Sequence, residues 1–361
     1  MTSETYDESF KKDCGYKDIC QIKSGKFSTV YKATRVTSGK VFAVKVLKND
    51  ENDLKEYRRI MQDEINFLKQ MNHDNIIKIY GSYISKGRLV LELAKGGDLN
   101  DAIKNRNGLD ELSAWHVINQ VIDATDYLHN ELRIQHNDIK PENILLMTND
   151  KLPLVKLTDF NLSSVRGKAK TEGGTVQYSA PEKLSAQIAN IPRGNETKKK
   201  TTKSLIVPPK IRALKGRKKT EAKPTTNSTL IAKCKAKVDV WAIGLTLYKM
   251  CTNENMFSSA NPRIVLDEIN KGKITNRIAK KLVVTSCDLK TFVKECLEIE
   301  QENRASIKDL KRHKWIKTAP VDDTAPYIKA KKIVRNFFFV CFCFCICICI
   351  CFCICIYLMS Y

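Results

Sequence analysis

The sequence predicts an α+β fold of two lobes, a small β-rich N-terminal lobe and a larger, mainly helical C-terminal lobe. Residues 19–47 contain short apolar runs separated by turn residues, which is typical of strands joined by hairpins. Residues 51–71 and much of the chain after residue 111 instead place apolar residues at helical spacing. We therefore expect the N-terminal lobe over about residues 16–93 and the C-terminal lobe over about residues 94–316.

Residues 19–47 are expected to form three strands, and in the last of them, over residues 40–47, alternation with a period of two places Ala43 and Lys45 on the same face. A lysine inside an apolar strand is usually an edge or solvent residue. The helix expected at 51–71 offers a partner, because Glu64 lies on its apolar stripe and a carboxylate partly removed from water needs a cation. We expect a Lys45–Glu64 ion pair; the alternative is two unrelated side chains that reach solvent separately.

The remaining strands and helices are predicted from the spacing of apolar residues, which is every second residue in strands and about every 3.6 residues in helices. Residues 73–79 and 88–93 are expected to form two further strands of the N-terminal lobe. Residues 111–130 carry one apolar face, which predicts a core helix, and residues 238–245 are apolar nearly all round, as in a central buried helix.

The residues that can carry chemistry are concentrated in two stretches, His136–Asn143 and Asp159–Asn161. A short apolar run follows the first stretch and another precedes the second. Two such strands joined by a tight connection would bring Asp138, Asn143 and Asp159 to one mouth. Two carboxylates, an amide and a lysine gathered there can bind Mg²⁺ and a phosphate, because hard cations prefer oxygen ligands.

These stretches resemble the catalytic loop and the metal-binding motif of eukaryotic protein kinases, whose patterns are His-Arg-Asp…Asn and Asp-Phe-Gly. Residues Gly174–Glu182 resemble the end of an activation segment of the serine/threonine form, and Lys140 matches the same form. The resemblance covers about residues 16–316 with one interruption. It implies a two-lobed protein kinase fold and a monomeric enzyme that uses ATP and Mg²⁺ to phosphorylate serine or threonine on protein substrates.

The resemblance also implies a role for each site residue. Asp138 would accept or orient the proton of the attacking hydroxyl, and Lys140 would neutralise charge on the transferred phosphoryl group. Lys45, held by Glu64, would position the phosphates of ATP. The residues implied to hold Mg²⁺ are Asn143 and Asp159. The residues implied to line the nucleotide site are Ile22, Gly25, Val30, Ala43, Leu91, Glu92, Leu93, Asp98 and Leu145.

Two further charged residues are expected to have structural partners. A buried Glu182 would need a cation, and Arg304 stands where the family supplies one. Asp239, inside the expected central helix, would accept hydrogen bonds from the backbone of the catalytic loop.

The sequence departs from the family pattern at four positions. Lys23 and Ser28 stand where the glycine-rich loop has glycines, which is expected to weaken phosphate clamping. Asn137 replaces the arginine that reads a phosphate on the activation segment, so phosphorylation there is expected to be dispensable. Asn161 replaces a glycine, and asparagine enters left-handed backbone conformations readily. These departures keep open the alternative of a catalytically impaired, kinase-like scaffold that binds partners through its C-terminal lobe and a basic segment at 190–232.

Two acidic residues suggest a substrate preference. Asp98 and Glu142 lie where some basic-directed kinases contact substrate arginines, and Asp98 could also bond the ribose. We therefore expect arginine or lysine near the phosphosite.

The formal net charge of +22 is unevenly spread. Residues 185–235 hold 14 lysines and arginines against Glu196 and Glu221, which predicts a basic insert at about 190–232 within the C-terminal lobe. Such a segment cannot bury enough apolar surface to fold alone. The alternatives are a solvated loop without a partner, a nuclear-import signal, or a contact to an anionic partner, either lipid or nucleic acid.

The two ends of the chain carry the signals for location. Residues 1–15 form a polar lead without a secretory signal. Eight of the 14 cysteines alternate with apolar residues within 341–355 and the rest are scattered, so we expect reduced thiols in the cytosol. Residues 337–358 are uncharged and apolar and follow a basic linker at 317–336, which favours a transmembrane anchor with the kinase facing the cytoplasm.

Three alternatives to that anchor stay open. The alternating tail could be a translated repeat without a selected role, or it could favour β-aggregation. A nuclear location is the alternative to the membrane, since the basic insert resembles an import signal.

Overall fold

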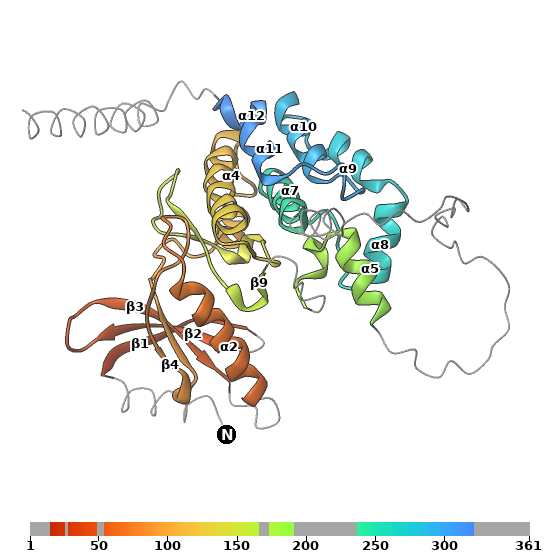
Figure 1. The fold of residues 1–361 in the computed structure, drawn as a ribbon. Helices are drawn as coiled ribbons and strands as arrows, with labels where there is room; N and C mark the ends of the chain where they lie inside the picture. The colour runs from red at the N-terminus through yellow and green to blue at the C-terminus, as the bar shows by residue number, and fades with distance from the viewer. Residues whose placement is uncertain (1–14, 26–27, 49–53, 166–172, 191–236, 321–361) are drawn as a thin grey trace, which may run out of the picture. The chain divides into compact units, whose positions relative to one another are not determined.

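The computed structural model describes residues 15–25, 28–48, 54–165, 173–190 and 237–320. Within this part of the chain, an antiparallel sheet with one helix forms the N-terminal lobe, and a group of helices forms the C-terminal lobe (Figure 1). The predicted two-lobed α+β fold is confirmed.

Five antiparallel strands form the sheet of the N-terminal lobe, in the order β1-β2-β3-β5-β4. In the register of the sheet, Lys45 pairs with Val30 on one side and Leu89 on the other, and Ala43 pairs with Leu91. The strand that carries Lys45 is therefore central, which explains how a lysine is held inside the lobe. The strands are β1 (Tyr16–Ser24), β2 (Ser28–Arg35), β3 (Val41–Leu47), β4 (Ile79–Tyr83) and β5 (Arg88–Leu91).

Helix α2 (Leu54–Lys69) packs its apolar stripe against this lobe. Met61, Ile65 and Leu68 are buried, as helical spacing requires, and Glu64 is buried among them with an exposed fraction of 2%. The helix predicted at 51–71 is confirmed, and so is the position of its one buried carboxylate.

The strand predicted at 73–79 is wrong. The strand of this region, β4, begins at Ile79, and the residues before it form a turn and a single bridge from Ile76 to Leu157. The backbone N–H of Ile77 donates to the carbonyl of Leu157, and the N–H of Leu157 donates to the carbonyl of Asn75. These hydrogen bonds go to the C-terminal lobe instead of the sheet, so the apolar run ties the two lobes together.

Helices α4 and α7 form the centre of the C-terminal lobe (Figure 1). Helix α7 is buried on nearly every side, as predicted, and Trp241 in it is fully buried. The segment predicted as one helix at 111–130 is helix α4, which ends in a wider π-turn at Tyr127–Glu131. The helices of this lobe are α3 (Leu99–Asn105), α4 (Glu111–Asp126), α5 (Pro181–Ala189), α7 (Lys237–Thr252), α8 (Pro262–Asn270), α9 (Lys273–Lys281), α10 (Cys287–Cys296), α11 (Ile307–Arg312) and α12 (Lys314–Lys317).

The C-terminal lobe also contains two short pairs of antiparallel strands. Strands β7 (Ile144–Leu146) and β8 (Val155–Leu157) pair directly, as the two apolar runs predicted. Strands β6 (Ile134–Gln135) and β9 (Ser164–Val165) pair beside them. The 3₁₀ turn η3 (Pro141–Asn143) directly precedes β7, and the 3₁₀ turn η4 (Phe160–Leu162) follows β8. Because β7 and β8 pair with each other, the stretches 136–143 and 159–161 lie close together.

The prediction of a membrane-anchored protein is contradicted. Among the residues that the structure describes, no helix is both long and apolar enough to cross a membrane. The longest described helices, α2, α4 and α7, have 16 residues each, whereas a bilayer core requires about 20 predominantly apolar ones. The segment 337–358, on which the prediction depended, lies outside the described residues.

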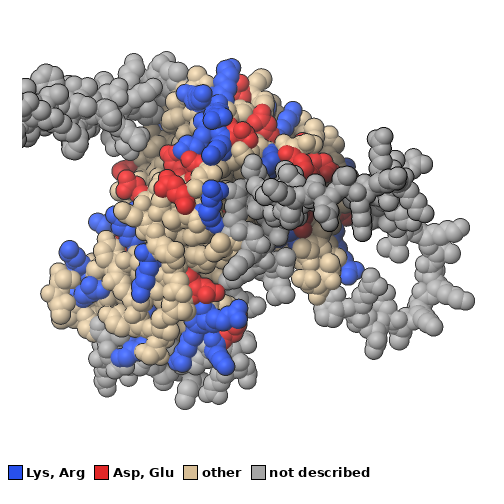
Figure 2. All heavy atoms as spheres, in the orientation of Figure 1, with Lys and Arg blue, Asp and Glu red and all other residues tan. Residues whose placement is uncertain are grey.

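The predicted basic insert at 190–232 also lies almost wholly outside the described residues. Within the described part, basic and acidic side chains are interspersed on the face that Figure 2 shows. This mixture fits the view that the positive charge is concentrated in one segment of the sequence.

Candidate active site

A cavity of about 280 Å³ lies between the two lobes, and we call it the interlobe cavity. Its apolar walls are formed by residues of strands β1–β3, of β5 and the segment that follows it, and of β7. Asp159 and Lys45 lie at the inner end, while Asp98 and Glu142 belong to the C-terminal lobe. The structure brings together around this cavity the predicted residues Ile22, Gly25, Val30, Ala43, Lys45, Leu91, Glu92, Leu93, Asp98, Asn143, Leu145 and Asp159.

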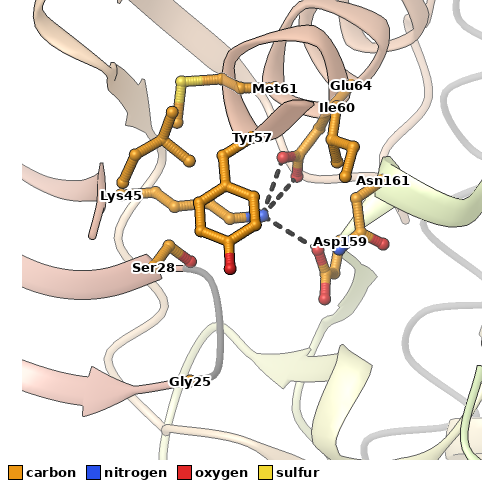
Figure 3. A pocket seen from close by; sticks show the side chains of 10 residues that line it. Gly25, Ser28, Lys45, Tyr57, Ile60, Met61, Glu64, Asp159 and Asn161 are labelled. Atoms are coloured by element: carbon orange, nitrogen blue, oxygen red, sulfur yellow. Dashed lines mark hydrogen bonds and ion pairs between the residues drawn. The ribbon is translucent and has the colours of Figure 1, made fainter. Parts of the chain in front are cut away.

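A smaller chamber of about 100 Å³ adjoins the inner end, beneath the turn between β1 and β2 (Figure 3). Lys45 points into it from β3, and its Nζ lies 2.7 Å from Oε2 and 3.0 Å from Oε1 of Glu64. The same Nζ lies 2.9 Å from Oδ1 of Asp159. One ammonium therefore joins strand β3, helix α2 and the end of β8, and the predicted Lys45–Glu64 pair is confirmed.

The charges of Lys45 and Asp159 stabilise each other, whereas burial raises the pKa of Glu64 above its usual value. Burial alone would lower the pKa of Lys45, but the carboxylates of Asp159 and Glu64 raise it above its usual value. Burial acts to raise the pKa of Asp159, and the Lys45 ammonium overcomes this and holds that pKa below its usual value. The lysine is thus positively charged at neutral pH and Asp159 is ionised, as binding of phosphate and a divalent cation requires.

A second cluster surrounds Asp138 in the loop between β6 and β7. Its Oδ2 accepts hydrogen bonds from Lys140 Nζ at 2.7 Å and from Asn143 Nδ2 at 3.0 Å. Its Oδ1 accepts from the backbone N–H of Thr175 at 3.1 Å and lies 3.2 Å from the Thr175 hydroxyl, which also accepts from Lys140 at 2.7 Å. The carboxylate has an exposed fraction of only 6%, so these contacts fix its direction.

The loop that carries Asp138 is held from behind by Asp239 of helix α7. The carboxylate of Asp239 accepts the backbone N–H groups of His136 at 2.9 Å and Asn137 at 2.8 Å, and it lies 2.7 Å from Nε2 of His129. The predicted role of Asp239 is confirmed. The predicted Glu182–Arg304 pair is confirmed too, with two parallel contacts of 2.8 and 3.0 Å.

The backbone argument made for Asn161 is wrong. Asn161 lies inside the 3₁₀ turn η4, and the positive φ of this region falls on Asp159, at 67°. Asn137 also has a φ of 67°, and its side-chain amide donates to the carbonyl of Leu162 and the hydroxyl of Ser164. The asparagine that needs a left-handed conformation is therefore the one that replaces arginine.

Two site residues were missed in the sequence. Lys23, on β1, donates a hydrogen bond to Oδ2 of Asp98, whose Oδ1 accepts the N–H of Asp101 and caps helix α3. Thr175 binds both Asp138 and Lys140. Thr175 could have been found from the Gly-Thr-x-x-Tyr motif, whereas nothing in the local sequence connects Lys23 with a carboxylate 75 positions away.

The oxygen atoms of Asn143 and Asp159 in the interlobe cavity fit a divalent cation that also binds phosphate. The described residues contain no group of three or more His, Cys, Asp or Glu that could hold a metal alone. Both N–H bonds of the Asn143 amide go to Asp138, which leaves its oxygen as an acceptor at the cavity, and Asp159 contributes a carboxylate beside it. Mg²⁺ is usually bound by one or two such ligands together with phosphates and water.

Comparison with known proteins identifies the family of this chain. The model of the family described as protein kinase domain matches residues 16–198 and 230–316. The chain is 30% identical over 328 residues to the serine/threonine-protein kinase ppk11 of Schizosaccharomyces pombe, covering 89% of this chain and 86% of that one. It is 26% identical over 337 residues to the serine/threonine-protein kinase RAD53 of Saccharomyces cerevisiae, but it spans only 36% of the length of that relative.

A solved structure, described as the crystal structure of Rad53 kinase domain and SCD2, has the same fold. The TM-score is 0.58 at 24% sequence identity, and the match covers 84% of this chain and 90% of the other. The family match spans most of the chain and includes both charged clusters. The chain therefore belongs to the protein kinase family and is of the serine/threonine type.

Proposed function

We propose that this chain transfers the γ-phosphoryl group of ATP to serine or threonine hydroxyls of protein substrates. The observation that supports it most is that Lys45, Asp159 and Asn143 line one apolar cavity, and that Asn143 bonds to the Asp138 carboxylate. The walls fit a flat, apolar base, and the inner end supplies a cation for phosphates and a carboxylate for the acceptor. Phosphoryl transfer depends on this kind of positioning and charge neutralisation.

In the proposed reaction, the substrate hydroxyl oxygen forms a bond to the γ-phosphorus, and the bond from that phosphorus to the bridging oxygen of the leaving ADP breaks. The hydroxyl proton passes to Asp138, whose direction is fixed by Asn143 and Thr175. Lys140 lies 2.7 Å from Asp138 and stabilises negative charge on the transferred group. Lys45 orients the phosphates from the other side.

Mg²⁺ fits the oxygens of Asn143 and Asp159, and when bound it neutralises charge on the phosphates. The contribution of the chain is to present these oxygens. The N–H groups of Asn143 are fixed on Asp138, and Asp159 is fixed by Lys45, so neither ligand needs to reorganise.

We further propose a preference for basic residues near the phosphosite. Glu142 lines the interlobe cavity, and within the described residues its Oε2 is buried without a hydrogen-bond partner. Such an oxygen costs free energy until a cation or donor reaches it. Asp98, the other predicted contact, already accepts from Lys23. A peptide array should therefore favour arginine or lysine, and an acidic or proline-directed preference would refute this part of the proposal.

The test of the main proposal is transfer of labelled phosphate from ATP by the full chain, with Mg²⁺ and a basic protein substrate. We expect transfer by the wild type and its loss in Asp138→Asn. A kinase-like scaffold is the alternative, since Lys23 and Ser28 replace two glycines of the glycine-rich loop and are expected to weaken phosphate clamping. Nucleotide binding without transfer in either protein would support the scaffold and overturn the proposal.

A further inference from the structure

Lys183, on helix α5, is a buried cation that the proposed mechanism does not use. Its exposed fraction is 8%, and its Nζ donates to the backbone carbonyl of Asn137 at 2.8 Å. Asn137 directly precedes Asp138. A long, flexible side chain loses conformational freedom when it is buried, so its interaction at this point must offset that cost.

Asn137 is held through its backbone N–H, its side-chain NH₂ group and its backbone carbonyl. Its backbone N–H donates to Asp239 on α7, and its side-chain amide donates to the carbonyl of Leu162 and the hydroxyl of Ser164. The carbonyl takes the remaining contact, from Lys183. Asn137 therefore contacts residues on both sides of residues 166–172: Leu162 and Ser164 precede them, and Lys183 follows them.

The space for the lysine depends on Gly174. A Cβ at this position would lie 2.7 Å from Lys183 Nζ, and the φ of Gly174 is +98°, which side chains rarely adopt. The next residue, Thr175, donates its backbone N–H to Asp138. The lysine thus bonds to Asn137, which precedes Asp138 in its own loop, and lies close to Gly174, which precedes Thr175, the partner of Asp138.

The charged neighbours of Lys183 offset only part of the effect that burial has on its pKa, which lies below its usual value. Burial lowers the pKa of Lys183, and Lys140 acts in the same direction, whereas the carboxylates of Asp138 and Asp239 act to raise it. A hydrogen bond from an ammonium to a carbonyl in a dry region is stronger than one between neutral groups.

We propose that Lys183 is a positioning residue for Asp138, acting through the Asn137 carbonyl and the Gly174–Thr175 turn. This inference rests on the proposed phosphotransfer. Without the amine, Asn137 loses one of its fixed contacts and the Asp138 carboxylate can tilt relative to Thr175. An error of about 1 Å in the position of a catalytic group can lower a rate by about 100-fold.

The test compares Lys183→Met with the wild type in the full chain. We expect kcat to fall by about tenfold or more while the KM for ATP stays unchanged, because Lys45 and the apolar walls are untouched. Lys183→Arg, which keeps a charged donor, should recover part of kcat. Lys249→Met is the control for loss of a buried lysine, since Lys249 on α7 has the same exposed fraction of 8%; because Glu142 and Asp98 act on its charge, it is compared by exchange and melting temperature and not by kcat.

A readout without turnover separates this inference from the proposed function. Hydrogen–deuterium exchange should speed up in the peptide over residues 136–140 in Lys183→Met and stay unchanged in Lys249→Met. If the wild type proves inactive, the exchange result still decides whether Lys183 holds the loop. Unchanged kcat and unchanged exchange would overturn the inference, and so would a loss of kcat that follows an equal loss of melting temperature in both variants.

Discussion

Lys23 of β1 donates a hydrogen bond to Asp98 at the N-terminus of α3, and this ion pair joins the two lobes at the interlobe cavity. Asp98 is buried and rigidly placed, because it also caps α3 and bridges to Leu145. Lys23 is half-exposed and belongs to the strand that leads into the turn over the phosphate end. Both residues line the interlobe cavity, so a nucleotide bound there would lie beside this contact.

Loss of the Lys23–Asp98 pair should speed nucleotide release. For Lys23→Met we expect the dissociation rate of a fluorescent ADP analogue to rise by about two- to fivefold, since a partly exposed pair contributes about 0.5–1 kcal/mol at most. Stopped-flow displacement measures this rate. High salt should remove the difference because salt screens exposed charges. Lys17→Met, an exposed lysine on the same strand, is the control; an equal effect in both variants would count against the pair.

Replacing Glu64 by glutamine should impair phosphate positioning without changing the shape of the chamber. Lys45 would then keep only Asp159 as a charged partner, and that carboxylate would be less available to a metal ion. We expect kcat/KM for ATP to fall by about tenfold to 100-fold. Initial rates at varied ATP measure the loss. A Glu64→Gln enzyme with wild-type kinetics would show that the pair has no part in catalysis.

Arg304 should be a stability determinant of the C-terminal lobe. It is buried, binds Glu182 through two nitrogens, and lies over the Trp241 ring at 4.9 Å. Arg304→Lys keeps the charge but loses the paired geometry, so we expect a loss of about 3 kcal/mol in the free energy of unfolding. Arg312→Lys, at an exposed position, should change it by less than about 0.5 kcal/mol. Urea denaturation distinguishes the two.

The contribution of Asp239 should depend on pH. Burial alone would raise its pKa, but hydrogen bonds from His129 and the His136 backbone lower it below the usual 3.8. A carboxylate whose pKa is lower in the folded state stabilises the fold above its unfolded value, and the stabilisation disappears as pH falls through the folded value. Asp239→Asn should therefore cost about 2–3 kcal/mol at pH 7, and the gap to the wild type should narrow below pH 3.8.

Denaturant titrations at pH 7, 5 and 3.5 would measure this gap. The difference at pH 5 should equal that at pH 7. A gap that widens on acidification would mean that the pKa of Asp239 is raised in the folded chain, contrary to the sign derived from its hydrogen bonds.

Local pattern predicted those contacts that a buried charge makes necessary. Glu64 on an apolar stripe required a cation, and the structure supplies Lys45; the pairing of Glu182, at the start of helix α5, with Arg304 followed from the resemblance to protein kinases. The positions of both chemical stretches followed from two short apolar strands that pair as β7 and β8. Glu64 had few ways to satisfy its charge, so sequence alone was enough.

Contacts that depend on three-dimensional neighbours were not predictable. The run at 73–79 has strand-like composition, but the N–H of Ile77 and the carbonyl of Asn75 bond to Leu157 of the other lobe. Lys23 and Lys183 are ordinary lysines in sequence, and their partners Asp98 and Asn137 lie 75 and 46 positions away. We expected a left-handed backbone conformation at Asn161 because it replaces a glycine of the family motif, whereas the structure has a positive φ at Asp159 and Asn137.

The most direct test of the account is the initial rate of phosphate transfer from ATP by Asp159→Asn beside the wild type, at saturating Mg²⁺. The Asp159 carboxylate bonds to Lys45, and Asp159 also lines the interlobe cavity together with Asn143. We predict a fall of at least about 100-fold with the fold intact, because both the metal ligand and the partner of Lys45 are weakened. A variant that transfers phosphate at the wild-type rate would contradict the proposed active site.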